Sequence, residues 1–318
     1  MTDPEKSNEC LIDVSKIDEI SYKLDDLTLA AIACGNKDHQ PVLCLHGYLD
    51  NAASFLPLMQ QITQERNLLA DKYVIALDWP GHGHSDHRNV GAHYHFFDYV
   101  SDLVALFKLN NWPAIDIVAH SMGAMVASAF AAAFPEKVKS LTLIDSFGFI
   151  CAPVEETTKQ LRHGVLSRIK TVKSSRSFTE DTAVKARMNV SDLQIDHANL
   201  IVQRSLVAVK PELNRKTAEE GASTLYRWRS DSRLRTVSLY RLSLVQGQQL
   251  FSDISCPLQL IYGDKGMDMV NTGLEQYSSC ITNLTITKLD GGHHVHMEQT
   301  QELSSLLSEF LSKIKTSV

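Results

Sequence analysis

The chain has 318 residues, with 31 Lys and Arg against 37 Asp and Glu, so its formal charge at pH 7 is −6. Hydrophobic residues make up 44% and charged residues 21%, the balance of a globular chain, which excludes disorder or a collagen-like structure for the chain as a whole. The mild acidity argues against nucleic acid as a partner, because phosphate binding needs a basic face, and no apolar run approaches the ~20 residues that span a bilayer.

Short apolar runs alternate with helical stretches along most of the chain, which predicts a parallel sheet with helices on both faces. Two strands, Ile17–Leu24 and Leu27–Ala33, come first and are joined by an acidic turn at Asp25-Asp26. The later runs that we expect to form strands are Val42–Leu45, Val74–Leu77, Ile115–Ala119, Leu141–Ile144, Leu258–Tyr262 and Leu284–Lys288. The helices expected beside them are Phe55–Gln64, Phe96–Leu109, Met122–Phe134, Thr272–Cys280 and Gln299–Ile314.

The alternation stops between Phe149 and Asp253, where the periodicity is helical and strand-like runs are few. We therefore expect residues 1–148 and 254–318 to form one α/β core and residues 149–253 to form a helical cap inserted into it. The insertion holds 17 Lys and Arg against 11 Asp and Glu, about +6, which leaves about −12 on the remainder. Phe178 and Trp228 would either line a pocket under this cap or form the cap's own small core.

The sharpest local signal is a strand, a sharp turn and an Ala-rich helix, with Ser121 at the apex of the turn. This is the pattern of a nucleophile elbow, G-x-S-x-G, in which Ala119 replaces the first glycine and Gly123 is the second. The neighbours of the serine must be small because larger side chains would collide with the adjacent strand or helix. The alternative is a serine that caps an ordinary helix.

Two further segments belong to the same chemistry. Leu45-His46-Gly47-Tyr48 follows a strand, so the backbone N–H groups of Tyr48 and Met122 would form an oxyanion hole beside Ser121. Near the C-terminus, Gly291-Gly292-His293 follows the last strand, five residues before Glu298, which we expect to open the last helix. His293 is our candidate general base, whereas His294 and His296 are expected to be structural or to line the pocket.

With these motifs the sequence resembles the α/β-hydrolase superfamily, and specifically the serine hydrolase-like proteins. The segments that carry the resemblance are 41–55, 78–85, the Ser121 elbow and 293–297. The resemblance implies an α/β-hydrolase fold: a mostly parallel eight-stranded sheet with helices on both faces and a helical cap inserted after the sixth strand. It also implies a serine hydrolase whose substrate is not defined by the motifs.

The acid that would orient His293 has three candidates. In hydrolases of this fold the acid usually lies after the strand Leu258–Tyr262, three residues past a glycine, and counted from Gly263 this position is Gly266. Asp264 and Asp268 flank that position. Related hydrolases with a displaced acid use the end of the preceding strand, where this chain and the resembled family carry Asp145. We expect Asp145 to be the orienting acid, with Asp264 and Asp268 as alternatives; a strand-end aspartate bonded to loop amides is the structural explanation for Asp145.

Neither metal nor cofactor is expected. The many histidines match no H-E-x-x-H or Cys/His spacing, and Gly81-x-Gly83 lacks the third glycine of a dinucleotide fingerprint. The basic segment around Arg227-Trp228-Arg229 would be either a solvated cap surface or a patch that attracts an anionic substrate.

The sequence thus predicts a serine hydrolase that cleaves a small ester, thioester or related carbonyl substrate through Ser121, His293 and Asp145. Two alternatives stay open: a hydrolase-fold protein that binds a ligand with little or no turnover, and an acyltransferase that uses the same triad. The first residues carry no secretory pattern, and the six scattered cysteines favour reduced thiols, so a cytoplasmic location is expected. The oligomeric state stays open.

Overall fold

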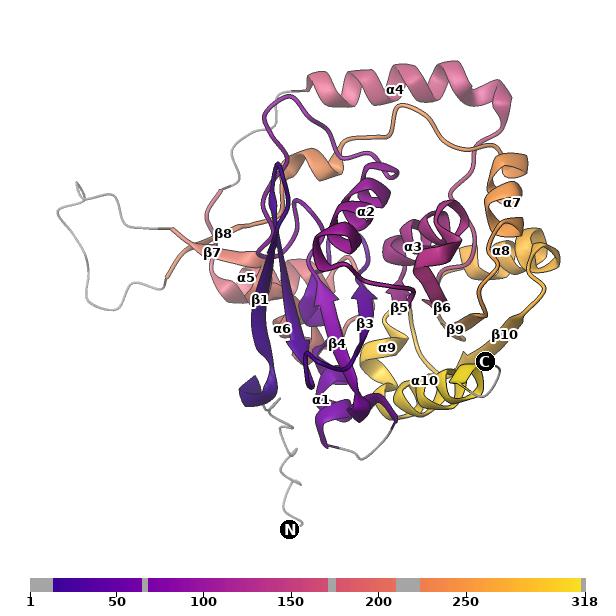
Figure 1. The fold of residues 1–318 in the computed structure, drawn as a ribbon. Helices are drawn as coiled ribbons and strands as arrows, with labels where there is room; N and C mark the ends of the chain where they lie inside the picture. The colour runs from indigo at the N-terminus through magenta and orange to yellow at the C-terminus, as the bar shows by residue number, and fades with distance from the viewer. Residues whose placement is uncertain (1–13, 65–67, 171–175, 210–223, 316–318) are drawn as a thin grey trace, which may run out of the picture.

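The computed structural model describes residues 14–64, 68–170, 176–209 and 224–315. An eight-stranded sheet lies at its centre, in the order β1-β2-β4-β3-β5-β6-β9-β10 (Figure 1). Neighbouring strands from β4 to β10 run parallel, whereas β2 is antiparallel to β1 and to β4. The strands are β1 (Asp18–Lys23), β2 (Thr28–Cys34), β3 (Gln40–Leu45), β4 (Lys72–Leu77), β5 (Ile115–His120), β6 (Val138–Ile144), β9 (Leu258–Gly263) and β10 (Leu284–Leu289).

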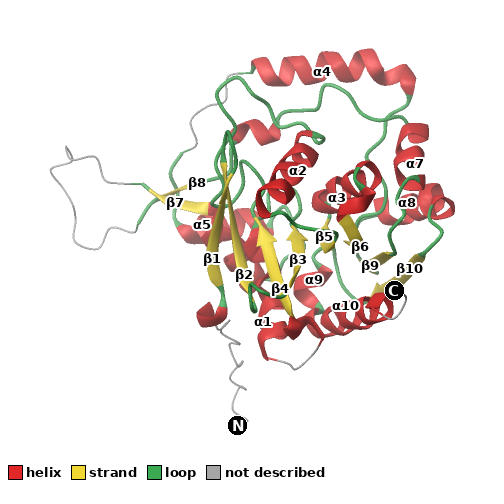
Figure 2. Cartoon of the chain, viewed as in Figure 1, coloured by secondary structure: helices red, strands yellow, loops and turns green. Residues whose placement is uncertain are grey.

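Helices cover both faces of this sheet, as the alternating pattern predicts (Figure 2). One face carries α1 (Leu56–Gln64), α9 (Val295–Glu298) and α10 (Thr300–Lys315), and the other carries α2 (Asp98–Asn110), α3 (Met122–Ala133), α7 (Leu244–Ser252) and α8 (Met269–Tyr277). Strand β3 shows why two cores form, since Leu43 and Leu45 point into one and Val42 and Cys44 into the other. Side chains that alternate along a strand must be apolar throughout when both faces are covered.

The expected strands and helices of the core are confirmed, with shifts of a few residues at their ends. One expectation is wrong: Glu298 does not open the last helix but ends the short helix α9, and α10 begins at Thr300. A four-residue helix is too short to show periodicity in a sequence. The cysteines of the described ranges are free thiols, while Cys10 lies outside those ranges.

The insertion after β6 contains α4 (Thr157–Ile169), α5 (Glu180–Met188), α6 (Ile195–Ser205) and a two-stranded ribbon of β7 (Leu206–Ala208) and β8 (Tyr226–Trp228). It has a small core, formed by α5, α6 and β7 together with Met297 of α9, against which Phe178 and Trp228 pack with their ring centroids 5.2 Å apart. Helix α7 differs, because its Phe251 is fully buried in the main core beside Phe147 and Tyr277. How much of 149–253 behaves as a separate cap stays a prediction.

Two arginines of the insertion bind carboxylates of the sheet-edge loops. Arg204 in α6 pairs with the fully buried Asp78, and also reaches Glu19 of β1. Arg187 in α5 pairs with the buried Asp50, in the loop after β3.

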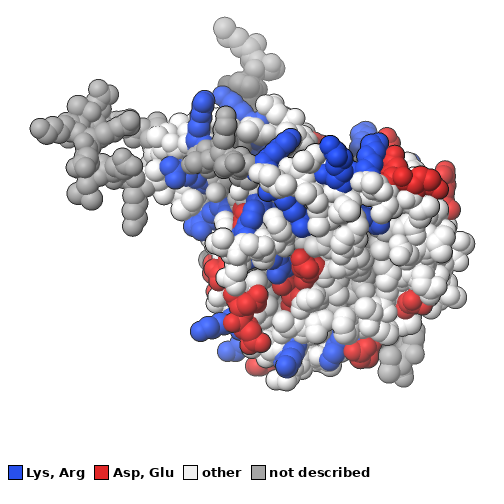
Figure 3. Space-filling view, turned by 90° about the horizontal axis from the view of Figure 1, so that it is seen from above, with Lys and Arg blue, Asp and Glu red and all other residues white. Residues whose placement is uncertain are grey.

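Figure 3 looks down on the side of the molecule that carries α4 and shows Lys and Arg side chains gathered on that side. Among the helices of the described ranges, none has the length and apolar character needed to cross a membrane.

Candidate active site

Ser121 stands between the end of β5 and the start of α3, with φ 51° and ψ −117°. This backbone conformation is one that L-residues rarely adopt, and the close packing around the turn fixes it. A Cβ at Gly123 would lie 2.8 Å from His46 O and would overlap the carbonyl oxygen of Leu45, so position 123 has room only for glycine. Ala119 is completely buried between the neighbouring strands β3 and β6. The elbow predicted from the sequence is therefore the local structure at Ser121.

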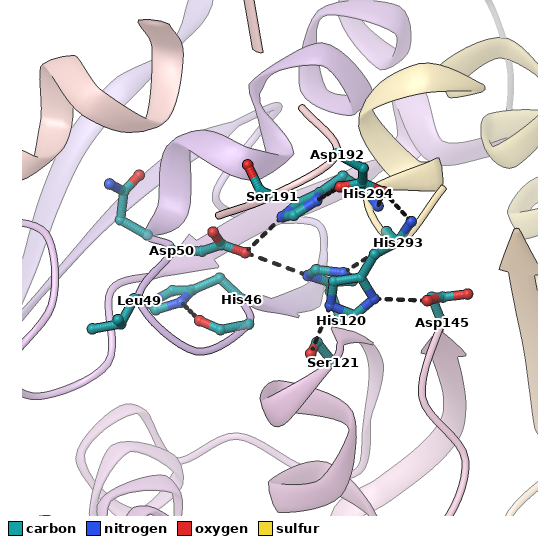
Figure 4. A network of polar contacts seen from close by, with 12 residues as sticks. His46, Leu49, Asp50, His120, Ser121, Asp145, Ser191, Asp192, His293 and His294 are labelled. Carbon is teal, nitrogen blue, oxygen red and sulfur yellow. Dashed lines mark hydrogen bonds and ion pairs between the residues drawn. The ribbon is translucent and has the colours of Figure 1, made fainter. Parts of the chain in front are cut away.

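The imidazole of His293 lies between Ser121 and Asp145 (Figure 4). His293 Nε2 is 3.0 Å from Ser121 Oγ, and His293 Nδ1 is 2.7 Å from Asp145 Oδ2. Because a carboxylate only accepts hydrogen bonds, Nδ1 carries the proton and donates to Asp145. In the neutral ring Nε2 is then the acceptor, and Ser121 Oγ–H is its donor. Three segments far apart in the sequence meet here.

Asp145 follows β6 directly, and its side chain is fully buried. Its φ of 44° turns the chain away from the strand, while its backbone N–H still donates to Ile261 O in β9. The carboxylate accepts the backbone N–H groups of Gly263 and Met267, both at 3.1 Å. Asp145 therefore makes the loop-amide contacts of a structural aspartate as well as the contact with His293, so the two explanations are not exclusive.

The other two acid candidates lie elsewhere. Asp264 is exposed and accepts the backbone N–H of Gly291, which holds the pKa of its carboxyl below the usual range. Asp268 precedes α8. Gly266, the position of the usual acid, lies against Asp145, and a Cβ there would be 2.7 Å from Asp145 Cγ. The Asp145 carboxylate thus occupies the space that a side chain at 266 would fill.

The loop that carries Tyr48 packs against the elbow. A Cβ at Gly47 would lie 3.1 Å from Ser121 Cβ and 2.9 Å from His120 Nδ1, so this backbone approaches Ser121 closely. The Tyr48 hydroxyl donates to Leu234 O of the insertion at 3.1 Å. In the described ranges, no hydrogen bond is donated by the backbone N–H of Tyr48 or of Met122. Two amide donors beside Ser121 are therefore available to a ligand.

The structure also places groups around His293 that the sequence patterns do not single out. They are the carboxylates Asp50 and Asp192 and the imidazole of His120 (Figure 4). Arg187 of α5 belongs with them, because it binds Asp50. His294 binds both carboxylates, and His296 is completely buried. The only signal for these groups in the sequence is a histidine directly beside each of two predicted site residues: His120 precedes Ser121, and His294 follows His293. Within the described ranges, no group of three or more His, Cys, Asp and Glu side chains is arranged to hold a metal ion.

Comparison with known proteins agrees with this architecture. The family model for the alpha/beta hydrolase fold matches residues 40–300. The serine hydrolase-like protein of Danio rerio is 28% identical over 290 residues, which are 87% of this chain and 83% of the relative. Serine hydrolase-like protein 2 of Homo sapiens is 27% identical over 296 residues, which are 89% of this chain and 90% of the relative.

A solved structure extends the likeness to three dimensions. The crystal structure of a hypothetical protein from Pseudomonas aeruginosa PAO1 is 30% identical, with a TM-score of 0.79, and the match covers 92% of this chain and 99% of that one. From the family match over most of its length, this chain belongs to the α/β-hydrolase fold family, among the serine hydrolase-like proteins.

Proposed function

We propose that the protein is a serine hydrolase that cleaves a small ester, thioester or related carbonyl substrate through an acyl-enzyme at Ser121. The observation that carries the proposal is the continuous chain of hydrogen bonds from Ser121 Oγ through His293 to Asp145, at 3.0 and 2.7 Å. A serine hydroxyl is a weak nucleophile until a base accepts its proton, and this chain supplies the base and the group that orients it.

The reaction follows from the proton positions. Ser121 Oγ attacks the carbonyl carbon while its proton passes to His293 Nε2. The positive charge that forms on the imidazole is stabilised by the buried Asp145 carboxylate. His293 then gives the proton to the leaving alcohol or thiol as the tetrahedral intermediate collapses. Water attacks the acyl-enzyme in a second cycle, in which His293 accepts a proton from the water and returns it to Ser121 Oγ.

The negative charge of each tetrahedral intermediate needs donors aimed at the carbonyl oxygen. We assign this role to the backbone N–H groups of Tyr48 and Met122, which face no acceptor in the described structure. Met122 opens helix α3, so its N–H also lies at the positive end of the helix dipole. Donors of this kind typically contribute about 100- to 1000-fold to kcat.

An apolar cavity of about 130 Å³ gives a place for the acyl group. The cavity reaches helix α3 at Met125. Met125 lies one helical turn after Ser121, and its backbone N–H donates to the backbone carbonyl of Ser121. The apolar lining of the cavity consists of Phe96, Phe97, Met125, Phe149, Ile150 and Leu242, and its polar lining of His95, Ser238, Tyr240 and Arg241. We expect an acyl chain on Ser121 to run along α3 into this cavity, with polar or anionic substituents beside the polar residues.

Labelling with a fluorophosphonate tests the nucleophile. The wild type should become covalently labelled at neutral pH, and Ser121→Ala should not. Ser128→Ala is the matched control, because Ser128 lies two turns further along α3 and its hydroxyl only donates to Ala124 O. A folded wild type that is not labelled would refute the proposal.

Of the two alternatives, a ligand-binding protein without turnover would follow if Gly266, in the usual place of the acid, left His293 without an orienting carboxylate. The contact between His293 and Asp145 favours turnover over that alternative. An acyltransferase uses the same first half-reaction, so the products distinguish it. We expect free acid to dominate when esters are turned over in the presence of alcohol or amine acceptors, and predominant transfer would identify an acyltransferase.

A further inference from the structure

The loop that carries His293 is held by a carboxylate of the insertion. Asp192, between α5 and α6, accepts the backbone N–H of His293 and, at 3.3 Å, that of His294. It also accepts His294 Nδ1–H at 2.6 Å (Figure 4). The loop approaches so closely that a Cβ at Gly292 would lie 2.9 Å from Asp192 Cγ. Three donors on one carboxylate fix the path of this loop next to the imidazole.

The other edge of the His294 ring faces the core. His294 Nε2 lies 3.4 Å from Asp50 Oδ2, and Asp50 is bound in turn by Arg187 of α5. Burial lowers the pKa of His294, but the two carboxylates outweigh it and raise the pKa to about 9. Burial likewise raises the pKa of Asp50, and Arg187 and His294 overcome this effect and hold it well below its usual range. The positive charges of His294 and Arg187 therefore balance the negative charges of the carboxylates Asp50 and Asp192.

The core binds the remaining polar group of the His293 backbone. His120 Nε2–H donates to His293 O at 2.9 Å, since a carbonyl can only accept. Burial lowers the pKa of His120 to about 4, so this ring is neutral at pH 7 and keeps its proton on Nε2. The N–H and the C=O of His293 are thus bound from opposite sides, one by the insertion and one by the core.

From these contacts we infer that Asp192 is a positioning residue for His293 and that His294 passes its effect to the core through Asp50. The inference rests on the proposed function, because it gives His293 the role of general base. Asp192 touches neither Ser121 nor Asp145 in the structure, so it acts through the backbone of the loop and not on the substrate. Its role makes the insertion part of the catalytic apparatus, and not only a cover over the site.

Replacement of Asp192 tests this inference. Asp192→Asn and Asp192→Ala should lower kcat by about ten- to a hundredfold, because a small displacement of the imidazole costs this much. KM for a short ester should change by less than about twofold. Asp196→Asn is the matched control, since Asp196 is an exposed aspartate in the first turn of α6, and its kcat should equal that of the wild type.

A second measurement does not depend on turnover. The proton on His293 Nδ1, shared with Asp145, should give a separate low-field proton NMR signal in the wild type and in Asp196→Asn. In Asp192→Asn this signal should shift or broaden. If the wild type is not labelled by fluorophosphonate, the proposed function fails, but the NMR signal still tests whether Asp192 positions the ring.

Three results would overturn the inference. One is a folded Asp192 variant with the kcat and the NMR signal of the wild type. Another is a lowered melting temperature with unchanged kcat, which would make Asp192 only structural. Should both Asp192 variants fail to fold, His294→Gln replaces them, because glutamine can still donate to Asp192 without the positive charge. His294→Gln should have a lower kcat and a shifted low-field signal of the His293 Nδ1 proton. If neither kcat nor this signal changes, that is the third contrary result.

Discussion

Asp145 and Gly266 share one volume: the carboxylate of the first fills the space into which any side chain of the second would extend. The two residues follow neighbouring parallel strands, β6 and β9, whose carboxyl ends meet at the same edge of the sheet. A side chain at 266 and the Asp145 carboxylate therefore exclude each other. The glycine at 266, the usual place of the acid, is thus the complement of the aspartate that follows β6, and we expect it to leave the proposed triad intact.

This relationship predicts which acid matters. Asp145→Asn should lower kcat by about 10⁴-fold, the usual cost of losing the aspartate of such a triad. Asp264→Asn and Asp268→Asn should stay within about twofold of the wild type, because neither side chain binds His293 in the structure. Ester turnover of the three purified variants measures this. A large loss in Asp264→Asn with normal activity in Asp145→Asn would reverse the assignment.

The shared volume also predicts that the acid can be moved. Gly266→Ala should reduce activity at least tenfold, because its methyl group displaces the Asp145 carboxylate. The double variant Asp145→Ala/Gly266→Asp places an acid where the first one was removed, and its kcat should exceed that of Asp145→Ala. Thermal unfolding of each variant serves as the control for folding. Equal kcat in the single and double variants would contradict the prediction.

His294 should make stability depend on pH above neutrality. Its folded pKa of about 9 lies above the ordinary value of 6.5, so the folded state retains a proton that the unfolded chain releases. The stabilisation is complete below about pH 6.5 and is lost as the pH rises through about 9. For this buried group it is on the order of 3 kcal/mol. Urea unfolding between pH 6 and 10 measures this. The difference in free energy of unfolding between wild type and His294→Gln should become smaller as the pH rises, and a constant difference would contradict the prediction.

A buried ion pair near the amino ends of the central strands, away from the proposed site, gives a prediction about stability alone. Lys72, at the start of β4, lies 2.8 Å from Asp116 in β5, and each side chain is 3% exposed. Lys72→Met leaves a buried carboxylate without its cation and should cost about 3–5 kcal/mol. Lys72→Met/Asp116→Asn should recover most of this, since the amide keeps an oxygen for the Ser140 hydroxyl. Urea unfolding measures both, and additive losses would count against the prediction.

The fold and two residues of the proposed site, Ser121 and His293, could be predicted because their signals are local. Alternating apolar runs mark the strands, small residues mark the turn at Ser121, and His293 follows the last strand after a pair of glycines. Asp145 also follows a strand, but the sequence leaves three candidate acids, and the preference for Asp145 rests on the family resemblance. Parallel strands place their carboxyl ends together, so side chains far apart in the sequence meet without any further information.

The surroundings of His293 could not be predicted in the same way. Asp50 and Asp192 come from a sheet-edge loop and from a turn of the insertion, and their partner Arg187 lies on α5. Helical periodicity tells which face of α5 and α6 is apolar, but not where these helices rest on the core. Charges that pair across such a contact have no fixed spacing in the sequence, so only the folded structure brings them together.

Ser121 and Asp145 are two of the four non-glycine residues with positive φ in the described ranges, and Leu49, beside Tyr48, is a third. Such conformations cost of order 1–3 kcal/mol each, and glycine would adopt them with little strain. We therefore expect Ser121→Gly to be inactive and yet about 1 kcal/mol more stable than the wild type in urea unfolding. The inactive variant should therefore have the higher free energy of unfolding. This result would mean that the backbone conformation at the turn is kept for catalysis at a cost in stability.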